Sequence, residues 1–154
     1  MTRRVAEDRA RAVAGGRRRV LAGLACAVAL VAGGARAQDP RASVVAATAR
    51  EWLALVDRGD ARAARERAGL KFRDAAPEDR WAKALAAQRG PRGAVVQRTL
   101  ATTRFERSFP GAPEGEYAVL AFRTAFEKQG GGTETVTLER EADGIWRVVG
   151  YTIH

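Results

Sequence analysis

Glu116-Tyr-Ala-Val-Leu-Ala-Phe-Arg-Thr-Ala-Phe126 is the stretch that decides the fold, because its side chains alternate between the two sides of an extended chain. One side carries Tyr117, Val119, Ala121 and Arg123, and the other carries Ala118, Leu120, Phe122 and Phe126. A period of two predicts a β-strand, whose successive side chains point to opposite faces of a sheet.

Two more strands are predicted after this stretch. Gly130-Gly-Gly132 predicts a turn into a strand over Thr133 to Arg140. Glu141-Ala-Asp-Gly144 then predicts a short hairpin loop, followed by a strand over Ile145 to Ile153. Glycine and aspartate favour such turns because they adopt the backbone conformations that a tight reversal requires.

One strand is predicted before it. Ala94 to Thr102 is rich in β-branched residues, which favour a strand. The prolines and glycines of Pro110 to Gly115 then indicate a loop. Four strands, three of them consecutive, predict an antiparallel meander.

The residues before Ala94 have helical periodicity instead. Asp39-Pro40 predicts the start of a first helix that Arg58-Gly59 ends, and Asp60 caps a second helix over Ala61 to Arg73. A third helix begins at Ala76-Pro-Glu-Asp79 and ends at Gly90-Pro91. Helices first and strands afterwards predict an α+β fold in which N-terminal helices pack on the sheet.

The first 37 residues are predicted to be a cleavable signal peptide, followed by a single domain over 38–154. An arginine-rich segment precedes the uncharged run Val20 to Val31, and Ala35-Arg-Ala37 follows as a small-residue cleavage site before Gln38. The run is shorter than the roughly 20 apolar residues that a membrane-spanning helix needs. We therefore expect export to the periplasm or outside the cell, with no stable membrane anchor after cleavage.

Two details of the export route stay open. Gly16-Arg-Arg-Arg-Val-Leu21 resembles a twin-arginine signal, but arginine-rich segments also occur in general secretion signals. Cys26 would be the lipidated residue of a lipoprotein, but Gly23 stands where leucine is usual and the apolar run continues past the cysteine.

Composition excludes several classes of function for the mature chain. The chain has 27 basic and 18 acidic residues, and the signal holds 8 and 2 of them, which leaves 19 and 16 and a net charge of +3. This modest charge argues against a nucleic-acid partner. The mature part contains no cysteine, and its one histidine is the terminal His154, so thiol chemistry, histidine triads and multi-histidine metal sites are excluded. No cofactor or metal is predicted.

Three segments together resemble a known family. They are Trp52-Leu-Ala-Leu-Val-Asp-Arg-Gly-Asp60, Pro113-Glu-Gly-Glu-Tyr117 with Thr135-Val-Thr-Leu138, and Gly144-Ile-Trp-Arg-Val-Val-Gly-Tyr151. They resemble the exported bacterial family catalogued as domain of unknown function 4019. The layout is also similar to the nuclear transport factor 2-like superfamily, in which helices lie in the mouth of a curved sheet. The resemblance implies fold and export and supplies no catalytic residues.

A curved sheet closed by helices predicts a pocket on its concave face. If one face of the second and last strands lines it, the ligand-binding candidates are Tyr117, Arg123, Arg147 and Tyr151. The alternative is that the arginines are solvated and the aromatic rings belong to the core. Trp146 is expected on the side of Val148 and Thr152, which faces the helices and opposes the side of Arg147 and Tyr151.

The aspartates at the end of the first helix are the candidates for acid–base chemistry. Asp60 already has a structural role as a helix cap, and Asp57 falls in the last helical turn. We therefore favour a non-enzymatic module that binds a small ligand or a protein, and assign no catalytic residue. The alternatives are an isomerase-, dehydratase- or hydrolase-like enzyme with a pocket carboxylate, and a scaffold that forms a homodimer through its sheet.

Overall fold

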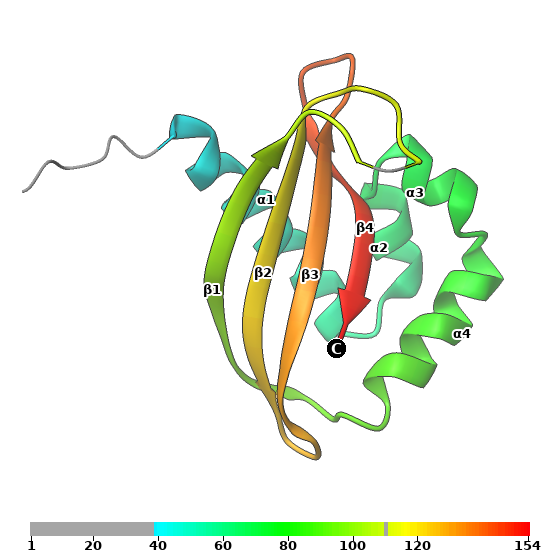
Figure 1. Ribbon diagram of the computed structural model, residues 1–154. Coiled ribbons are helices and arrows are strands. Elements are labelled where there is room, and N and C mark those ends of the chain that lie inside the picture. Colours follow the sequence, from blue (N-terminus) through cyan, green and yellow to red (C-terminus); the bar gives the residue numbers. More distant parts are fainter. Residues whose placement is uncertain (1–38, 110) are drawn as a thin grey trace, which may run out of the picture. The chain divides into compact units, whose positions relative to one another are not determined.

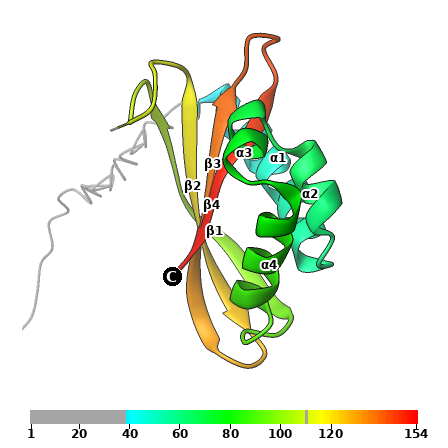
Figure 2. The same ribbon diagram turned by 90° about the vertical axis from the view of Figure 1, so that its right-hand side faces the viewer.

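Four helices precede four strands in the computed structural model, which describes residues 39–109 and 111–154. The helices are α1 (Pro40–Asp57), α2 (Ala61–Arg67), α3 (Leu70–Ala75) and α4 (Glu78–Arg89). All of them lie on one side of the sheet (Figures 1 and 2). None of the helices in the described part of the chain is long and apolar enough to cross a membrane.

The strands β1 (Val95–Glu106), β2 (Tyr117–Phe126), β3 (Gly130–Arg140) and β4 (Trp146–Ile153) form one curved antiparallel sheet. Their order in the sheet is their order in the chain, so each strand pairs with the one before it. The predicted α+β fold, with N-terminal helices on an antiparallel meander, is therefore confirmed.

The first helix begins and ends as its sequence predicts. The Asp39 side chain accepts a hydrogen bond from the backbone N–H of Arg41 at 2.9 Å, and Pro40 occupies the first helical position. At the other end Gly59 has a φ of 72°, a left-handed conformation that favours glycine.

The predicted second helix is wrong in its extent, because the chain leaves the helix at Ala68 and re-enters one at Leu70. Gly69 lies against the free edge of β4, where its N–H donates to the Val148 carbonyl at 2.8 Å. A Cβ atom at Gly69 would stand 2.8 Å from a Glu141 carboxylate oxygen and 3.1 Å from a Val149 methyl group. Glycine leaves room for this approach, whereas a larger residue would require the Glu141 carboxylate and Val149 to shift.

The turn predicted at residues 130–132 is also wrong in its position, because these glycines form the first three residues of β3. The turn itself spans residues 127–129. Gly132 lies beneath the Phe126 ring, and a Cβ atom there would be 3.3 Å from that ring and 3.0 Å from the His154 carbonyl oxygen. The missing side chain is what lets the strand pass under the ring.

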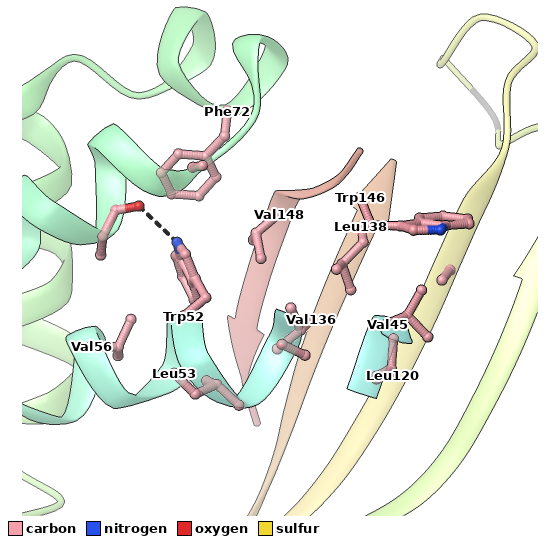
Figure 3. Packing of buried hydrophobic residues seen from close by; sticks show 14 of the residues in the cluster. Val45, Trp52, Leu53, Val56, Phe72, Leu120, Val136, Leu138, Trp146 and Val148 are labelled. Carbon is pink, nitrogen blue, oxygen red and sulfur yellow. Dashed lines mark hydrogen bonds between the residues drawn. The ribbon is translucent and has the colours of Figure 1, made fainter. Parts of the chain in front are cut away.

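The core lies between α1 and the helix-facing side of the sheet (Figure 3). Trp52 is 2% exposed, and its ring packs edge-on against Phe72 and Tyr151, with centroids 5.9 and 5.2 Å apart. Its indole N–H donates to the Ala64 carbonyl at 2.7 Å. A buried tryptophan is stable where its polar N–H has a partner, and α2 supplies it.

Candidate functional site

A fully buried carboxylate, that of Glu134, lies on the helix-facing side of β3. The register of the sheet places it opposite Phe122, on the same face as Val136 and Leu138. Its Oε1 accepts from Arg89 Nη1 at 2.9 Å and from the Tyr151 hydroxyl at 2.6 Å. Its Oε2 accepts from Arg98 Nε at 2.6 Å and from the Thr124 hydroxyl at 2.5 Å. A charge buried this deeply requires such partners.

A second carboxylate completes the site from the end of α1. Asp57 Oδ2 accepts from Arg98 Nη1 at 2.7 Å, and Oδ1 accepts from Arg98 Nη2 at 2.8 Å and from Arg89 Nη2. Each arginine therefore bonds to both acids, and the four formal charges sum to zero. We call Asp57, Arg89, Arg98 and Glu134 the charged cluster.

The protonation states follow from these contacts. Burial disfavours the charge on Arg98, but its hydrogen bonds with Asp57 and Glu134 outweigh burial and raise the pKa of the guanidinium. Burial, with the adjacent Glu134 carboxylate, raises the pKa of Tyr151 above its usual range. Tyr151 thus keeps its proton and serves as a donor to Glu134.

The two carboxylates of the charged cluster already accept hydrogen bonds at most of their acceptor sites. Glu134 accepts four hydrogen bonds and Asp57 accepts three. Within the described residues, no buried side-chain nitrogen or oxygen lacks a hydrogen-bond partner. A general base needs a lone pair that can reach a substrate proton, and these contacts engage all four acceptor sites of Glu134 and three of the four of Asp57.

An open cleft leads from solvent to the charged cluster. It has a volume of about 500 Å³ and lies between the end of α1, the start of α2 and the side of α4. We call it the α4 cleft. Its lining residues are Val56, Asp57, Arg58, Gly59, Ala61, Ala82, Leu85, Ala86, Arg89, Gly90, Gly93 and Ala94. The Asp57 side chain is 28% exposed, whereas that of Glu134 is 0% exposed, so a ligand in the cleft would meet Asp57 first.

A second depression, of about 610 Å³, lies between α1, α2 and the start of β4 and is lined by Leu55, Trp146 and Arg147 among others. Arg147 is engaged there by Glu141 at 2.6 Å and Asp143 at 2.8 Å. The α4 cleft is the stronger candidate because it alone of the two reaches the charged cluster. No three His, Cys, Asp or Glu side chains among residues 39–109 and 111–154 group closely enough to hold a metal ion.

The structure corrects the predicted faces of the last strand. Leu138 pairs with Val148, but Thr137 pairs with Gly150, so Val149 is an extra residue that forms a β-bulge. The bulge shifts the later residues by one position and turns Tyr151 toward the helices, where it packs on Trp52 and bonds to Glu134. Trp146 and Val148 face the helices as predicted, with Trp146 6% exposed.

The four predicted ligand-binding side chains do not come together. Tyr151 lies on the helix-facing side, whereas the register places Tyr117, Arg123 and Arg147 on the opposite side. Tyr117 is 2% exposed, and its hydroxyl donates to the Pro113 carbonyl at 2.9 Å. Arg123 is exposed to solvent. The predicted cleavage site at Ala37 and Gln38, and Cys26, lie outside the described residues.

The sequence analysis missed three of the four residues of the charged cluster, although a signal was present. Glu134 has the same parity as Val136 and Leu138, which places an acid on the apolar face of its strand. Arg98 likewise shares the side of Leu100, and Arg89 stands four residues after Leu85 on α4. Charges on an apolar face require partners, and three such residues together could have predicted an internal ion-pair network.

Comparison with known proteins gives a family and no function. Residues 48–151 match the model of the family described as protein of unknown function (DUF4019). The chain belongs to the DUF4019 family. No curated protein and no solved structure matches the chain. The match spans the DUF4019 domain from the middle of α1 to Tyr151, so it includes all four residues of the charged cluster.

Proposed function

We propose that this DUF4019 domain is a non-enzymatic module that binds a small ligand in the α4 cleft. The observation that carries the proposal is an open cleft whose wall includes two members of the charged cluster, Asp57 and Arg89. Aliphatic side chains of Val56, Ala82 and Leu85 line the cleft, and Asp57 and Arg89 contribute its charged groups. Apolar walls with a few fixed polar groups are the usual composition of a small-molecule site.

The enzymatic alternative has less support from the same geometry. An isomerase- or hydrolase-like mechanism requires a carboxylate that accepts a substrate proton. Glu134 is buried behind its four donors, and Asp57 is held by two guanidinium groups. Glu134 is therefore out of reach of a substrate, and Asp57 would have to leave both guanidinium groups before it could accept a substrate proton.

A matched pair of substitutions on α4 tests the site. Ala86 lines the cleft, whereas its neighbour Ala87 does not, and both are exposed. A panel of small fragments titrated into isotope-labelled protein should shift the amide resonances of residues around the cleft. Ala86→Trp should abolish these shifts because its ring fills the cleft, and Ala87→Trp should retain them. Shifts that persist in Ala86→Trp, or that map elsewhere, would contradict the proposal.

A second measurement separates binding from catalysis. Any fragment that binds the cleft is incubated with the protein, and its NMR spectrum is followed over time. The binding module returns the fragment unchanged, whereas an enzyme would convert it, and Asp57→Asn would then slow the conversion.

We also propose that the chain is exported and that the mature protein begins at Gln38, which rests on the signal-like composition of residues 1–37. Mass spectrometry of the periplasmic or secreted protein measures its N-terminus. An intact N-terminus, or a lipid on Cys26, would contradict this cleavage. Light scattering on the same sample distinguishes the monomer from the homodimer alternative.

A further inference from the structure

Asp57 occupies a position that is built for a carboxylate. Two N–H groups of Arg98 donate in parallel, Nη1 to Oδ2 at 2.7 Å and Nη2 to Oδ1 at 2.8 Å. Arg89 Nη2 donates a third bond to Oδ1. A guanidinium fork matches the two coplanar oxygens of a carboxylate and selects this group by shape as well as by charge.

Asp57 is also the member of the charged cluster that can leave. It ends α1 immediately before Arg58 and Gly59, and its side chain is 28% exposed at the wall of the α4 cleft. A rotation of its side chain would carry the carboxylate into water. The donors would keep their orientation, because Glu134 still holds Arg98 through Nε at 2.6 Å and Arg89 through Nη1 at 2.9 Å.

Charge balance then defines the replacement. With Asp57 turned to solvent, two guanidinium groups and one buried carboxylate remain, with a net charge of +1. The Arg89 and Arg98 side chains are only 10% and 13% exposed, so an unbalanced charge on them is poorly solvated. A monoanion restores neutrality, a dianion overshoots it, and a cation is repelled.

The walls of the cleft specify the rest of the ligand. Val56, Ala61, Ala82, Leu85 and Ala86 present aliphatic groups beside the position of the carboxylate. An apolar group attached to the carboxylate would be removed from water there, and such burial favours binding.

We infer that the ligand of the α4 cleft is a small aliphatic carboxylate that replaces Asp57 between Arg89 and Arg98. This inference rests on the proposed binding function and adds the ligand class. Asp57 is then an internal competitor that keeps the arginines neutralised while the cleft is empty.

Butyrate, butylammonium and butanol are the probes, since they share an aliphatic chain and differ in the charge of the head group. Asp57→Ala removes the competitor, so butyrate should bind this variant on the order of tenfold or more tightly than the parent, by NMR titration. Butylammonium and butanol should gain nothing from the substitution. Asp60→Ala is the matched control, because it removes an aspartate three residues away that only caps α2, and it should leave butyrate affinity unchanged.

Two further measurements guard against a variant that merely loses stability. Asp57→Ala/Arg98→Lys keeps a positive charge but loses the fork, and it should lose most of the gain in butyrate affinity. In the unmodified protein, saturating butyrate should move the ¹³C resonance of the Asp57 carboxylate toward that of a solvated aspartate.

The outcomes separate the two proposals. If butanol or butylammonium binds the cleft and butyrate gains nothing in Asp57→Ala, the carboxylate inference is wrong and the binding function stands. If no fragment of any charge binds the cleft in either protein, both are wrong. An Asp57 resonance that does not move at butyrate saturation would also overturn the exchange with Asp57.

Discussion

The two ends of the helix-facing side of the sheet are filled by opposite kinds of side chain. At one end the Trp146 ring packs edge-on against Phe105, with centroids 6.1 Å apart. At the other end the buried Glu134 bonds to four donors, two of them arginines. We call these the apolar end and the charged end.

The difference lies in what each end requires from the rest of the fold. Apolar side chains gain stability from any apolar neighbour, because burial itself is favourable. Glu134 needs specific donors, and they come from α4, β1, β2 and β4, while Asp57 comes from α1. The charged end can therefore be complete only when those helices and all four strands are in place, and it ties the helix ends to the sheet.

The largest effect is expected at the apolar end. Trp146→Ala should lower the free energy of unfolding by about 3–5 kcal/mol, since it empties the space of a buried ring. Denaturant unfolding measures this change. Ile145→Ala is the control, because Ile145 is 53% exposed beside it and should cost far less. Equal effects of the two substitutions would mean that the apolar end is not packed as described.

Removing one charge at the other end should have the next largest effect. Glu134→Gln keeps the size of the side chain but leaves two arginines with a single carboxylate, and it should cost about 3 kcal/mol, at the low end for a broken buried ion pair. Glu106→Gln, on an exposed position of β1, is the control and should be close to neutral. An unchanged unfolding midpoint for Glu134→Gln would show that the carboxylate is not needed at this position.

High pH should weaken the charged end through Tyr151. Burial and Glu134 raise the pKa of Tyr151, so above its ordinary value of about 10 the unfolded chain loses the proton that the folded chain keeps. The stability from neutral Tyr151 is thus present below about pH 10 and falls as the pH rises. Tyr151→Phe should flatten the fall in melting temperature between about pH 9 and pH 11.

The pH-dependent stability that Lys71 contributes must be separated from that of Tyr151 in this test. Its hydrogen bonds with Glu139 and Tyr117 raise its pKa, so its contribution is lost with rising pH in the same direction. The Lys71→Met variant should retain the part of the slope that belongs to Tyr151. If Tyr151→Phe and the parent protein fall with identical slopes, Tyr151 is not the group that titrates at the charged end.

The smallest effect is expected at Asp60, which caps α2 near the charged end. The Asp60 side chain accepts from the backbone N–H of Ala63 at 3.0 Å, so Asp60→Ala should cost about 1 kcal/mol, as for a lost helix cap. Asp60→Ser should restore most of this stability because serine also caps. A failure of serine to restore it would assign Asp60 a role beyond the cap.

Parts of the fold were predictable because they depend on neighbours in the chain. The caps at Asp39 and Asp60, the end of α1 at Gly59 and the alternation in β2 all follow from local geometry. The burial of Trp146 followed in the same way, from alternation within a few residues of a turn.

The site was less predictable because its residues are far apart in the chain. Asp57, Arg89, Arg98 and Glu134 come from four different elements, and only Asp57 was considered as a candidate. Tyr151 was named for a pocket, but the bulge at Val149 sends it to the side opposite Arg147. A one-residue bulge reverses every later side chain, and no local periodicity reveals it.

The sequence by itself determined the order of helices and strands, the helix caps and the family of this chain. The elements and caps are set by residues close together, through backbone conformation and side-chain period, and the family by three segments spread over the chain. Only the tertiary structure decided which charges are buried and what neutralises them. A buried carboxylate is stable only beside donors brought by distant segments, and those distances exist only once the sheet and helices have assembled.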